Sequence, residues 1–520
     1  MKKSHKTARS ALMIMIFTLG SKLLGFIRET LIASKFGSGM LTDAFFIAVS
    51  ATTLVGSFIL SSISTTFIPV ISEVEAREGR GGKIKHTNNI INITAALSLA
   101  LVIIALAGTP LIVRILASGF EGEQFNLAVN LTRIGLPIIL FSGLIGVLKG
   151  FLESEQRFYA TAIIGIPFNL AYIFYLVFMS SLFGIKGLMV TAVIAVFTQL
   201  LVQIPELIKA GFRYKFIFDF KDNYINKVLY LSLPVLLGTA INDLNVIIDK
   251  TLASRLVSGS ISALNYANKL NGLLLGVFIS AIATVVFPLL AKEFSNNNIT
   301  GVKRIMSYGV ILILLITIPA TVGLAVLATP IVQVAFERGA FNPNDTIMTS
   351  SALIFYSLGL VASALRLLIT RVYYSLQDTR TPMINGVISL GLNIILNLIF
   401  IQFMAHTGLA CATSISNTVT TLLLFYVLKK KIGSLGTWGY IRNFIKAGLA
   451  SVLMGVIVYT VYHGLYGLLG VSKLLDLLSL LAAVGTGVIV YSVLCYVFGI
   501  EEVKELIGKI RDRVLRGTGI

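Results

Sequence analysis

About 14 apolar runs, each long enough to cross a bilayer, make up most of this 520-residue chain. A helix needs about 20 apolar residues to span the hydrocarbon core of a membrane. Every backbone polar group of such a segment must find its partner within the protein, which a helix provides by itself. We therefore predict an all-α polytopic membrane protein with about 14 transmembrane helices and short connections. The runs are centred in 11–33, 44–70, 89–116, 130–151, 159–183, 187–208, 227–252, 261–291, 304–334, 349–374, 382–404, 407–428, 442–466 and 476–499.

The distribution of Lys and Arg predicts how the chain is oriented. Mean hydropathy is +0.90, and only 12% of the residues are charged. With the N-terminus placed inside, the inside segments contain 30 of the 42 basic residues and the outside segments contain 6. The positive-inside rule then predicts that both termini are cytoplasmic and that the number of helices is even. Basic loops beside anionic headgroups also account for the net charge of +19, so we expect no nucleic-acid partner.

The other six basic side chains lie within the apolar runs. A cation at membrane depth costs several kcal/mol unless it faces a partner, a cavity or water, so such residues indicate a functional pathway. Since few acidic residues accompany them, we expect an anionic cargo. They are Lys22, Arg28, Arg133, Lys250, Lys269 and Arg366.

Two of these runs place their cations where they could border a cavity. Lys22 and Arg28 can do so together if their helix bends at its glycines. The alternative is that Lys22 pairs with Glu29, which would leave Arg28 unmatched. Lys269 ends a polar stripe in the run 261–291, too deep for easy snorkelling, and the alternative for this stripe is hydrogen bonding between helices.

The remaining polar candidates have two interpretations each. Asp43 begins the second run, where it could contact the cargo or simply cap the helix. Arg366 could continue the cationic path, or mark the inner interface. Arg133 and Lys250 fit an interface position or pairing with a neighbour.

A second group of side chains offers oxygen ligands for a hard cation such as Na⁺. Hydrogen bonds between helices, with Asp249 paired to Lys250, explain the same residues equally well. The group consists of Asp249, Asn393, Asn397 and Thr413.

The chain also repeats itself at an offset of 220 to 221 residues. An offset of six helices gives both copies the same orientation, as in transporters whose two lobes rock about a central site. We therefore expect a six-helix lobe in 1–215, a second in 216–432, and two extra helices with a basic tail in 433–520. The matching pairs include Ala33 with Ala253, Ser34 with Ser254, Ser38 with Ser258, Gly39 with Gly259, Phe120 with Phe341 and Gly187 with Gly408.

Several motifs resemble the MurJ (MviN) family of bacterial lipid II flippases over nearly the whole chain. The first block contains SKLLGFIRE, FGSGMLTDAFF and TTFIPV within residues 21–70. The second contains FERGAFNPND at 336–345, YYSLQDTRTP at 373–382 and TGLACATS at 407–414.

This resemblance implies two six-helix lobes of the multidrug/oligosaccharidyl-lipid/polysaccharide exporter type, with two extra helices that form a groove for a lipid tail. The essential basic positions of the family fall on Lys22, Arg28 and Lys269, and its helix-2 aspartate falls on Asp43. Two of the three basic positions hold lysine where arginine is expected. A basic position and a glutamate further along the family's second helix fall on Gly56 and Ser61.

The resemblance implies a monomeric flippase rather than an enzyme. It would move an undecaprenyl-pyrophosphate-linked peptidoglycan precursor across the bacterial cytoplasmic membrane by alternating access, with Na⁺ or H⁺ as the candidate coupling ion and no bound cofactor. A flippase for another polyprenyl-linked polysaccharide or a teichoic acid precursor, or a cation-coupled drug exporter, has the same fold. A membrane glycosyltransferase would need acidic residues on outer loops, where only a few stand.

Overall fold

The computed structural model describes residues 2–276, 280–469 and 472–504, and the regular structure in this part of the chain is helical. The all-α prediction is confirmed, and each of the 14 expected spans lies on one to three of these helices, with residues 277–279 of the expected span 261–291 outside the described residues. They are α1 (Lys2–Phe36), α2 (Met40–Leu116), α3 (Gly122–Gly135), α4 (Pro137–Ser154), α5 (Phe158–Ala162), α6 (Gly165–Phe178), α7 (Ser180–Lys209), α8 (Asn223–Ala253), α9 (Ser260–Leu274), α10 (Ser280–Ser295), α11 (Ile299–Val326), α12 (Ala328–Phe336), α13 (Pro343–Leu358), α14 (Leu360–Ser375), α15 (Arg380–Ile432), α16 (Thr437–Leu469) and α17 (Lys473–Val497).

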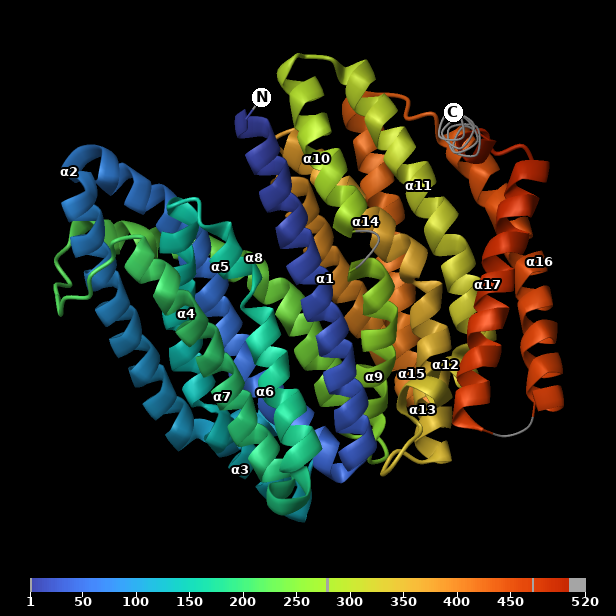
Figure 1. The fold of residues 1–520 in the computed structure, drawn as a ribbon, viewed down its shortest axis with the longest axis horizontal. Coiled ribbons are helices and arrows are strands. Elements are labelled where there is room, and N and C mark those ends of the chain that lie inside the picture. Colours follow the sequence, from blue (N-terminus) through green and yellow to red (C-terminus); the bar gives the residue numbers. More distant parts are fainter. Residues whose placement is uncertain (1, 277–279, 470–471, 505–520) are drawn as a thin grey trace, which may run out of the picture. The chain divides into compact units, whose positions relative to one another are not determined.

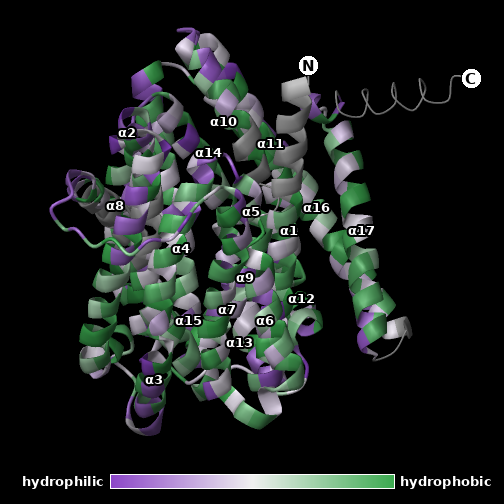
Figure 2. Ribbon diagram, turned by 60° about the vertical axis from the view of Figure 1, so that its left-hand side comes forward, coloured by the Kyte–Doolittle hydropathy of each residue, from purple (hydrophilic) through white to green (hydrophobic). Residues whose placement is uncertain are grey.

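The described helices are long and apolar, as a bilayer demands. By length and hydropathy, nine helical stretches among the described residues can each cross a membrane, and a bent pair formed by α13 and α14 makes a tenth. Figure 2 shows hydrophobic residues along most of α17, and hydrophilic residues where α2 turns over. Large apolar side chains on α17, such as Ile489 and Val497, are more than half exposed, as expected for a surface that faces lipid.

The chain forms two compact units, one made of residues 1–262 with 338–342, the other of the remaining residues. In the first unit α2 packs against α4 and α8, and α1 packs against α6 (Figure 1). In the second unit α11 packs against α14 and α16, and α16 lies beside α17. The lobe boundary expected at residue 216 stays a prediction.

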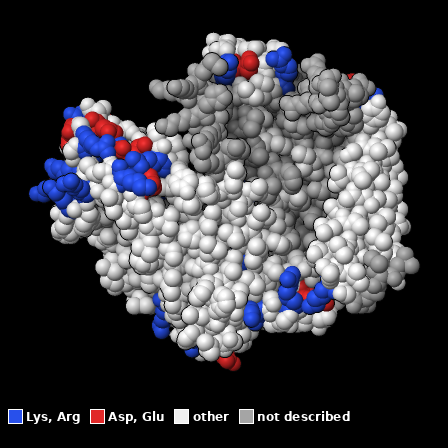
Figure 3. Space-filling view, viewed as in Figure 1, with Lys and Arg blue, Asp and Glu red and all other residues white. Residues whose placement is uncertain are grey.

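Charged residues hold the first unit together where α2 bends. Gly79 has a φ of +69° and allows α2 to reverse between two predicted spans. Just beyond it, Lys83 is almost fully buried, with its Nζ 2.7 Å from Glu75 Oε2 and 2.6 Å from Glu155 Oε1. Lys83 also lies over the ring of Phe151. The bend is therefore fixed to the end of α4 by a paired, desolvated ammonium group. Figure 3 shows charged side chains gathered in this region.

The repeat is visible in a reciprocal pair of contacts within the first unit. The backbone N–H of Ala340 donates to the Ser34 carbonyl at 2.8 Å, and the N–H of Gly119 donates to Ser254 Oγ at 3.1 Å. A Cβ on Gly339 would come within 2.2 Å of the Ser34 carbonyl oxygen, and one on Gly119 within 2.4 Å of that of Ser254. Because 34 and 254, like 119 and 339, differ by 220, each repeat contributes the loop that packs on the other's helix junction.

A second trace of the repeat lies in the backbone. Gly184 has a φ of +55° and lies within α7, between the predicted spans 159–183 and 187–208. Ala405, 221 residues further on, has a φ of +48° between the two predicted spans of α15. A left-handed φ is easy for glycine and costs a residue with a Cβ about 1–2 kcal/mol. The second copy therefore keeps the bend of the first without its glycine.

We predict that Ala405→Gly stabilises the protein against thermal unfolding in detergent by about 1 kcal/mol, because it removes the strain of a positive φ at alanine. The matched variant Gly184→Ala should destabilise it by about 1–2 kcal/mol. An unchanged or lower unfolding temperature for Ala405→Gly would contradict the prediction.

Candidate functional site

Arg28 is the best-defined cation at membrane depth in the first unit. Its guanidinium carbon lies 5.3 Å from the ring centre of Phe168 and 5.0 Å from that of Tyr172, both on α6. Its Nη2 lies 2.7 Å from Glu29 Oε1, so Arg28 is not left unmatched, as it would be in the alternative that pairs Glu29 with Lys22. Two aromatic faces and one carboxylate compensate a charge whose side chain is only 16% exposed.

One donor of Arg28 is left over. Among the described residues, Arg28 Nε is buried and meets no hydrogen-bond acceptor. A buried guanidinium N–H without an acceptor is costly in a folded protein, and an anionic cargo would supply the acceptor. This N–H is therefore a donor that an added acceptor could use.

Close contact between α1 and α6 places Arg28 against the two rings. Asn169 Nδ2 donates to the Ser21 carbonyl at 3.0 Å and to the Gly165 carbonyl at 2.8 Å. A Cβ on Gly165 would come within 2.1 Å of Ser21 Oγ, so a larger residue there would force the Ser21 side chain to move. Helix α1 runs through its glycines as one helix, with Lys22 half-buried one and a half turns before Arg28.

Asp43 is buried and organises the start of α9. Its Oδ2 accepts from the backbone N–H of Gly259 at 2.7 Å. Its Oδ1 accepts from the N–H of Ser262 at 2.8 Å and from Ser262 Oγ at 2.5 Å. The alternative that Asp43 caps its own helix is wrong, because the N-cap of α2 is Gly39 and Asp43 instead binds the unpaired donors of another helix. This contact could not be read from local spacing.

Lys250 has oxygen partners close to Asp43 in the chain. Its Nζ donates to the Phe46 carbonyl at 3.2 Å and to Ser50 Oγ. Arg133 is exposed on α3, in agreement with an interface position. Neither residue shows the unsatisfied donor that marks Arg28.

In the second unit Arg366 is bound by polar side chains of α15. Its Nη1 donates to Ser389 Oγ and to Asn417 Oδ1, both at 3.1 Å. No sequence pattern predicts these partners, which lie 23 and 51 residues away from Arg366. Lys269 is exposed on α9. How these two residues lie toward Lys22 and Arg28 of the first unit stays a prediction.

Three of the four residues expected to bind a cation come together on the two arms of α15. Asn393 Nδ2 donates to Thr413 Oγ1 at 3.2 Å, and Asn397 Nδ2 donates to Asn393 Oδ1 at 2.8 Å. Both asparagines are fully buried. Asp249, the expected carboxylate, belongs to α8 in the first unit. Among the described residues, no cluster of three or more His, Cys, Asp or Glu could hold a metal ion.

Comparison with solved structures defines the class. The fold matches an inward-facing multidrug resistance MATE family transporter of the MOP superfamily, with a TM-score of 0.68 at 14% identity over 81% of this chain and 99% of that one. A likeness at this identity shows the fold alone. The chain thus has the architecture of a multi-pass membrane transporter.

Closer relatives then define the family. The family model for lipid II flippase MurJ matches residues 32–479. A probable lipid II flippase MurJ of Buchnera aphidicola subsp. Acyrthosiphon pisum is 32% identical over 86% of this chain and 89% of that protein. One from Vibrio cholerae is 31% identical over 81% and 83%. A solved lipid II flippase MurJ in the inward closed conformation has a TM-score of 0.80 at 28% identity, covering 95% of this chain and all of the other. The chain belongs to the lipid II flippase MurJ family, which is a family of transporters rather than enzymes.

We predict that Asp43→Ala destabilises the protein by about 2–4 kcal/mol, because two backbone donors of α9 lose a buried charged acceptor. Asp43→Asn keeps one acceptor oxygen and should lose less. Thermal unfolding of both purified variants measures the difference. Equal unfolding temperatures for Asp43→Ala and the parent would show that the contact does not organise α9.

Proposed function

We propose that this chain moves lipid II, the undecaprenyl-pyrophosphate-linked peptidoglycan precursor, from the inner to the outer leaflet of the bacterial cytoplasmic membrane by alternating access. The observation that carries the proposal is the buried guanidinium of Arg28, held between two rings and with one N–H unused. A pyrophosphate oxygen is a suitable acceptor, since arginine binds phosphate through charge-assisted hydrogen bonds.

Further cations complete the proposed binding site. Lys22, on the same helix as Arg28, and Lys269, on α9, would each add a point charge to the pyrophosphate. Arg366 would extend the basic path in the second unit. Asp43 would act by positioning α9, the helix that carries Lys269, since its carboxylate binds that helix at its first residues.

An apolar cavity in the second unit supports the lipid part of the proposal. It measures about 610 Å³ and lies among α11, α14, α15 and α16. Aliphatic and aromatic side chains form most of its lining, among them Leu314, Ile318, Leu365, Phe425 and Phe444. A polyprenyl chain would bury apolar surface there without leaving polar groups unpaired. We propose that the tail enters this cavity beside α16.

The proposal also includes the orientation of the chain in the membrane and its oligomeric state. Both termini lie in the cytoplasm, as the distribution of Lys and Arg favours. The protein works as a monomer, because one chain supplies both repeats and all the proposed cargo contacts. It needs no nucleic-acid partner, and its surroundings are the lipids of the membrane.

Complementation of a bacterium depleted of its own lipid II flippase tests this function. The parent chain should restore growth, and Arg28→Ala and Lys269→Ala should fail at matched protein levels. Loss of one charged hydrogen bond weakens binding roughly 10- to 100-fold. Arg133→Ala is the matched control, because Arg133 is an exposed arginine outside the site, and it should rescue fully.

Failure of the parent chain, despite correct membrane insertion, would refute lipid II as the cargo. Full rescue by both Arg28→Ala and Lys269→Ala would instead refute the cationic site. These two results are distinguishable because the first concerns the unmodified chain and the second only its variants.

We also propose that Asp249, Asn393, Asn397 and Thr413 bind a coupling Na⁺. The buried amide and hydroxyl oxygens on α15 are ligands that hard cations accept. An ion can shift the inward–outward equilibrium only by its different affinity for the two states. The observed hydrogen bonds among the three α15 residues also fit a purely structural network, and the ion therefore needs its own test.

Transport or cargo binding in proteoliposomes should rise when Na⁺ replaces K⁺ at constant ionic strength. Asp249→Ala should remove this dependence, because it deletes the only carboxylate of the proposed site. Asp476→Asn, which changes a buried carboxylate of α17, serves as the control and should keep it. A Na⁺ response that survives in Asp249→Ala would refute the assignment, and a response to proton gradients alone would point to H⁺.

A further inference from the structure

The linker between α7 and α8 presents three phenylalanine side chains to the surroundings of the first unit. Phe216 is 76% exposed, Phe218 46% and Phe220 52%. Residues 212–219 have no helix or sheet of their own. Three neighbouring phenylalanines exposed in this way are unusual for a surface that meets only water. We call these three residues the phenylalanine stripe.

The stripe follows the alternation of an extended backbone. The rings of Phe216 and Phe218 are parallel within 2°, with centroids 6.3 Å apart. Those of Phe218 and Phe220 meet edge to face at 5.0 Å. Side chains two residues apart share one face of an extended segment, so the three rings form one continuous apolar surface.

The backbone behind the stripe is fixed to α2. Three asparagine side chains of α2 donate hydrogen bonds to carbonyl groups of the linker. The residues whose carbonyls accept are all odd-numbered, whereas the phenylalanines of the stripe are even-numbered. The stripe is therefore held in place before any partner arrives, and docking it requires little further ordering. The three bonds join Asn88 to Arg213 at 3.0 Å, Asn89 to Asp219 at 2.9 Å and Asn92 to Ile217 at 2.8 Å.

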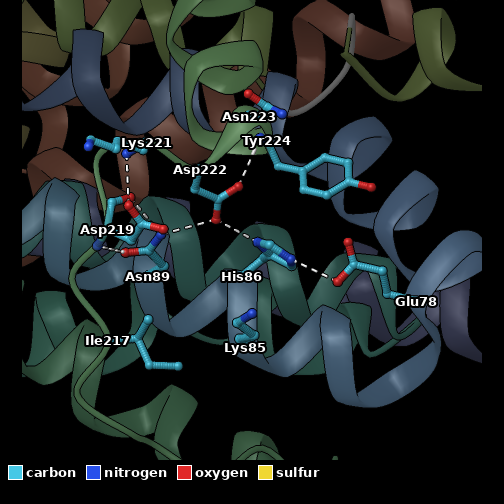
Figure 4. Close-up of a pocket in the computed structure, with 10 residues that line it drawn as sticks. All are labelled: Glu78, Lys85, His86, Asn89, Ile217, Asp219, Lys221, Asp222, Asn223 and Tyr224. Atoms are coloured by element: carbon cyan, nitrogen blue, oxygen red, sulfur yellow. Dashed lines mark hydrogen bonds and ion pairs between the residues drawn. The ribbon is translucent and has the colours of Figure 1, made fainter.

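A polar pocket secures the end of the linker (Figure 4). His86 lies between two carboxylates, with Nδ1 2.5 Å from Asp222 Oδ2 and Nε2 2.9 Å from Glu78 Oε2. Burial raises the pKa of Asp222, but hydrogen bonds from Asn89, His86 and the Tyr224 backbone outweigh it and hold the pKa below its usual range. Asp222 also accepts from the Tyr224 N–H as the N-cap of α8. The linker is thus joined to both α2 and α8.

Basic side chains flank the stripe. Arg213, Lys215 and Lys221 are all exposed. The two acidic residues of the linker are engaged, since Asp219 accepts from the Lys221 N–H and Asp222 binds His86. Figure 3 shows Lys and Arg side chains grouped at this edge of the first unit. The surface therefore combines aromatic rings with an excess of positive charge.

The preceding helix shows at what depth the linker emerges. Large apolar side chains are exposed along one stripe of α7, at Val190, Ile194, Leu201 and Ile208. Ile208, which is 68% exposed, lies in the last turn, next to Lys209 at the end of the helix. The hydrocarbon layer therefore reaches to the end of α7, and the residues that follow emerge among the lipid headgroups, where interfacial segments insert phenylalanine and other apolar side chains beside basic residues.

We propose that the phenylalanine stripe is a membrane-interface anchor that inserts into the headgroup region of a leaflet rich in anionic phospholipid. Arg213, Lys215 and Lys221 contact the phosphates, and the three rings pack against the upper acyl chains. The anchor holds the start of α8 at a fixed depth. With the orientation proposed above, this leaflet is the cytoplasmic one, whose anionic lipids attract basic residues.

Single-tryptophan fluorescence in lipid vesicles tests the anchor. The one native tryptophan, Trp438, is first changed to Phe. Phe216→Trp and Phe218→Trp should then give blue-shifted emission and strong quenching by phospholipids brominated near the headgroup end of the chain. Glu121→Trp is the control, at an exposed position of the first unit outside the linker, and should give red-shifted emission that acrylamide quenches. Phe220→Trp replaces either variant that does not reach the membrane folded.

Bromolipid quenching at the two stripe positions decides the proposal. Absence of bromolipid quenching at both stripe positions would overturn it, whether the rings are then accessible to acrylamide or covered by protein. Addition of phosphatidylglycerol to phosphatidylcholine vesicles should increase the quenching severalfold. The variant with Arg213, Lys215 and Lys221 changed to Gln should lose this increase. An equal response in both proteins would refute the part of the proposal that concerns anionic lipid.

Discussion

A polar group inside a bilayer has no water to bind, so the protein itself must supply its partner. This constraint explains how the buried polar residues are arranged. Lys250 meets a carbonyl and a hydroxyl, and Arg366 meets a serine and an asparagine. Asp43 meets the first donors of α9. Each of these contacts joins two different helices, so the cost of burying polarity also determines which helices pack.

Arg28 departs from this pattern in an informative way. Its charge is compensated by Glu29 and by two rings, but one of its N–H groups is not. Aromatic faces attract a cation without using its hydrogen-bond donors. Under the function proposed above, a guanidinium stabilised in this way could remain buried while the cargo is absent and donate to it afterwards. The aromatic rings therefore stabilise the buried charge and still leave an N–H able to donate. A set of carboxylates would stabilise the charge by accepting from the same N–H groups.

The spans and the repeat could be predicted from the sequence because they depend on patterns of hydropathy and residue identity along the chain. Hydropathy fixes where a helix can cross a membrane, and the offset of 220 residues appears again in the paired contacts of Ser34 and Ser254. The partners could not be predicted in the same way. For Asp43 the local pattern offered cargo contact or a cap for its own helix, whereas its oxygens accept hydrogen bonds from residues more than 200 positions away. Phe168 and Tyr172 stand four residues apart on α6, a spacing that any lipid-facing helix could show.

The reciprocal contacts of the two repeats bear on how the protein is made. The junction between α1 and α2 is completed by the Ala340 backbone, which belongs to the other repeat. During synthesis the first helices therefore enter the membrane long before the loop that closes them has left the ribosome. Contacts of such long sequence separation form slowly. The junction between α1 and α2 therefore stays incomplete in the bilayer at first. Assembly of the first unit can finish only after most of the second repeat has been translated.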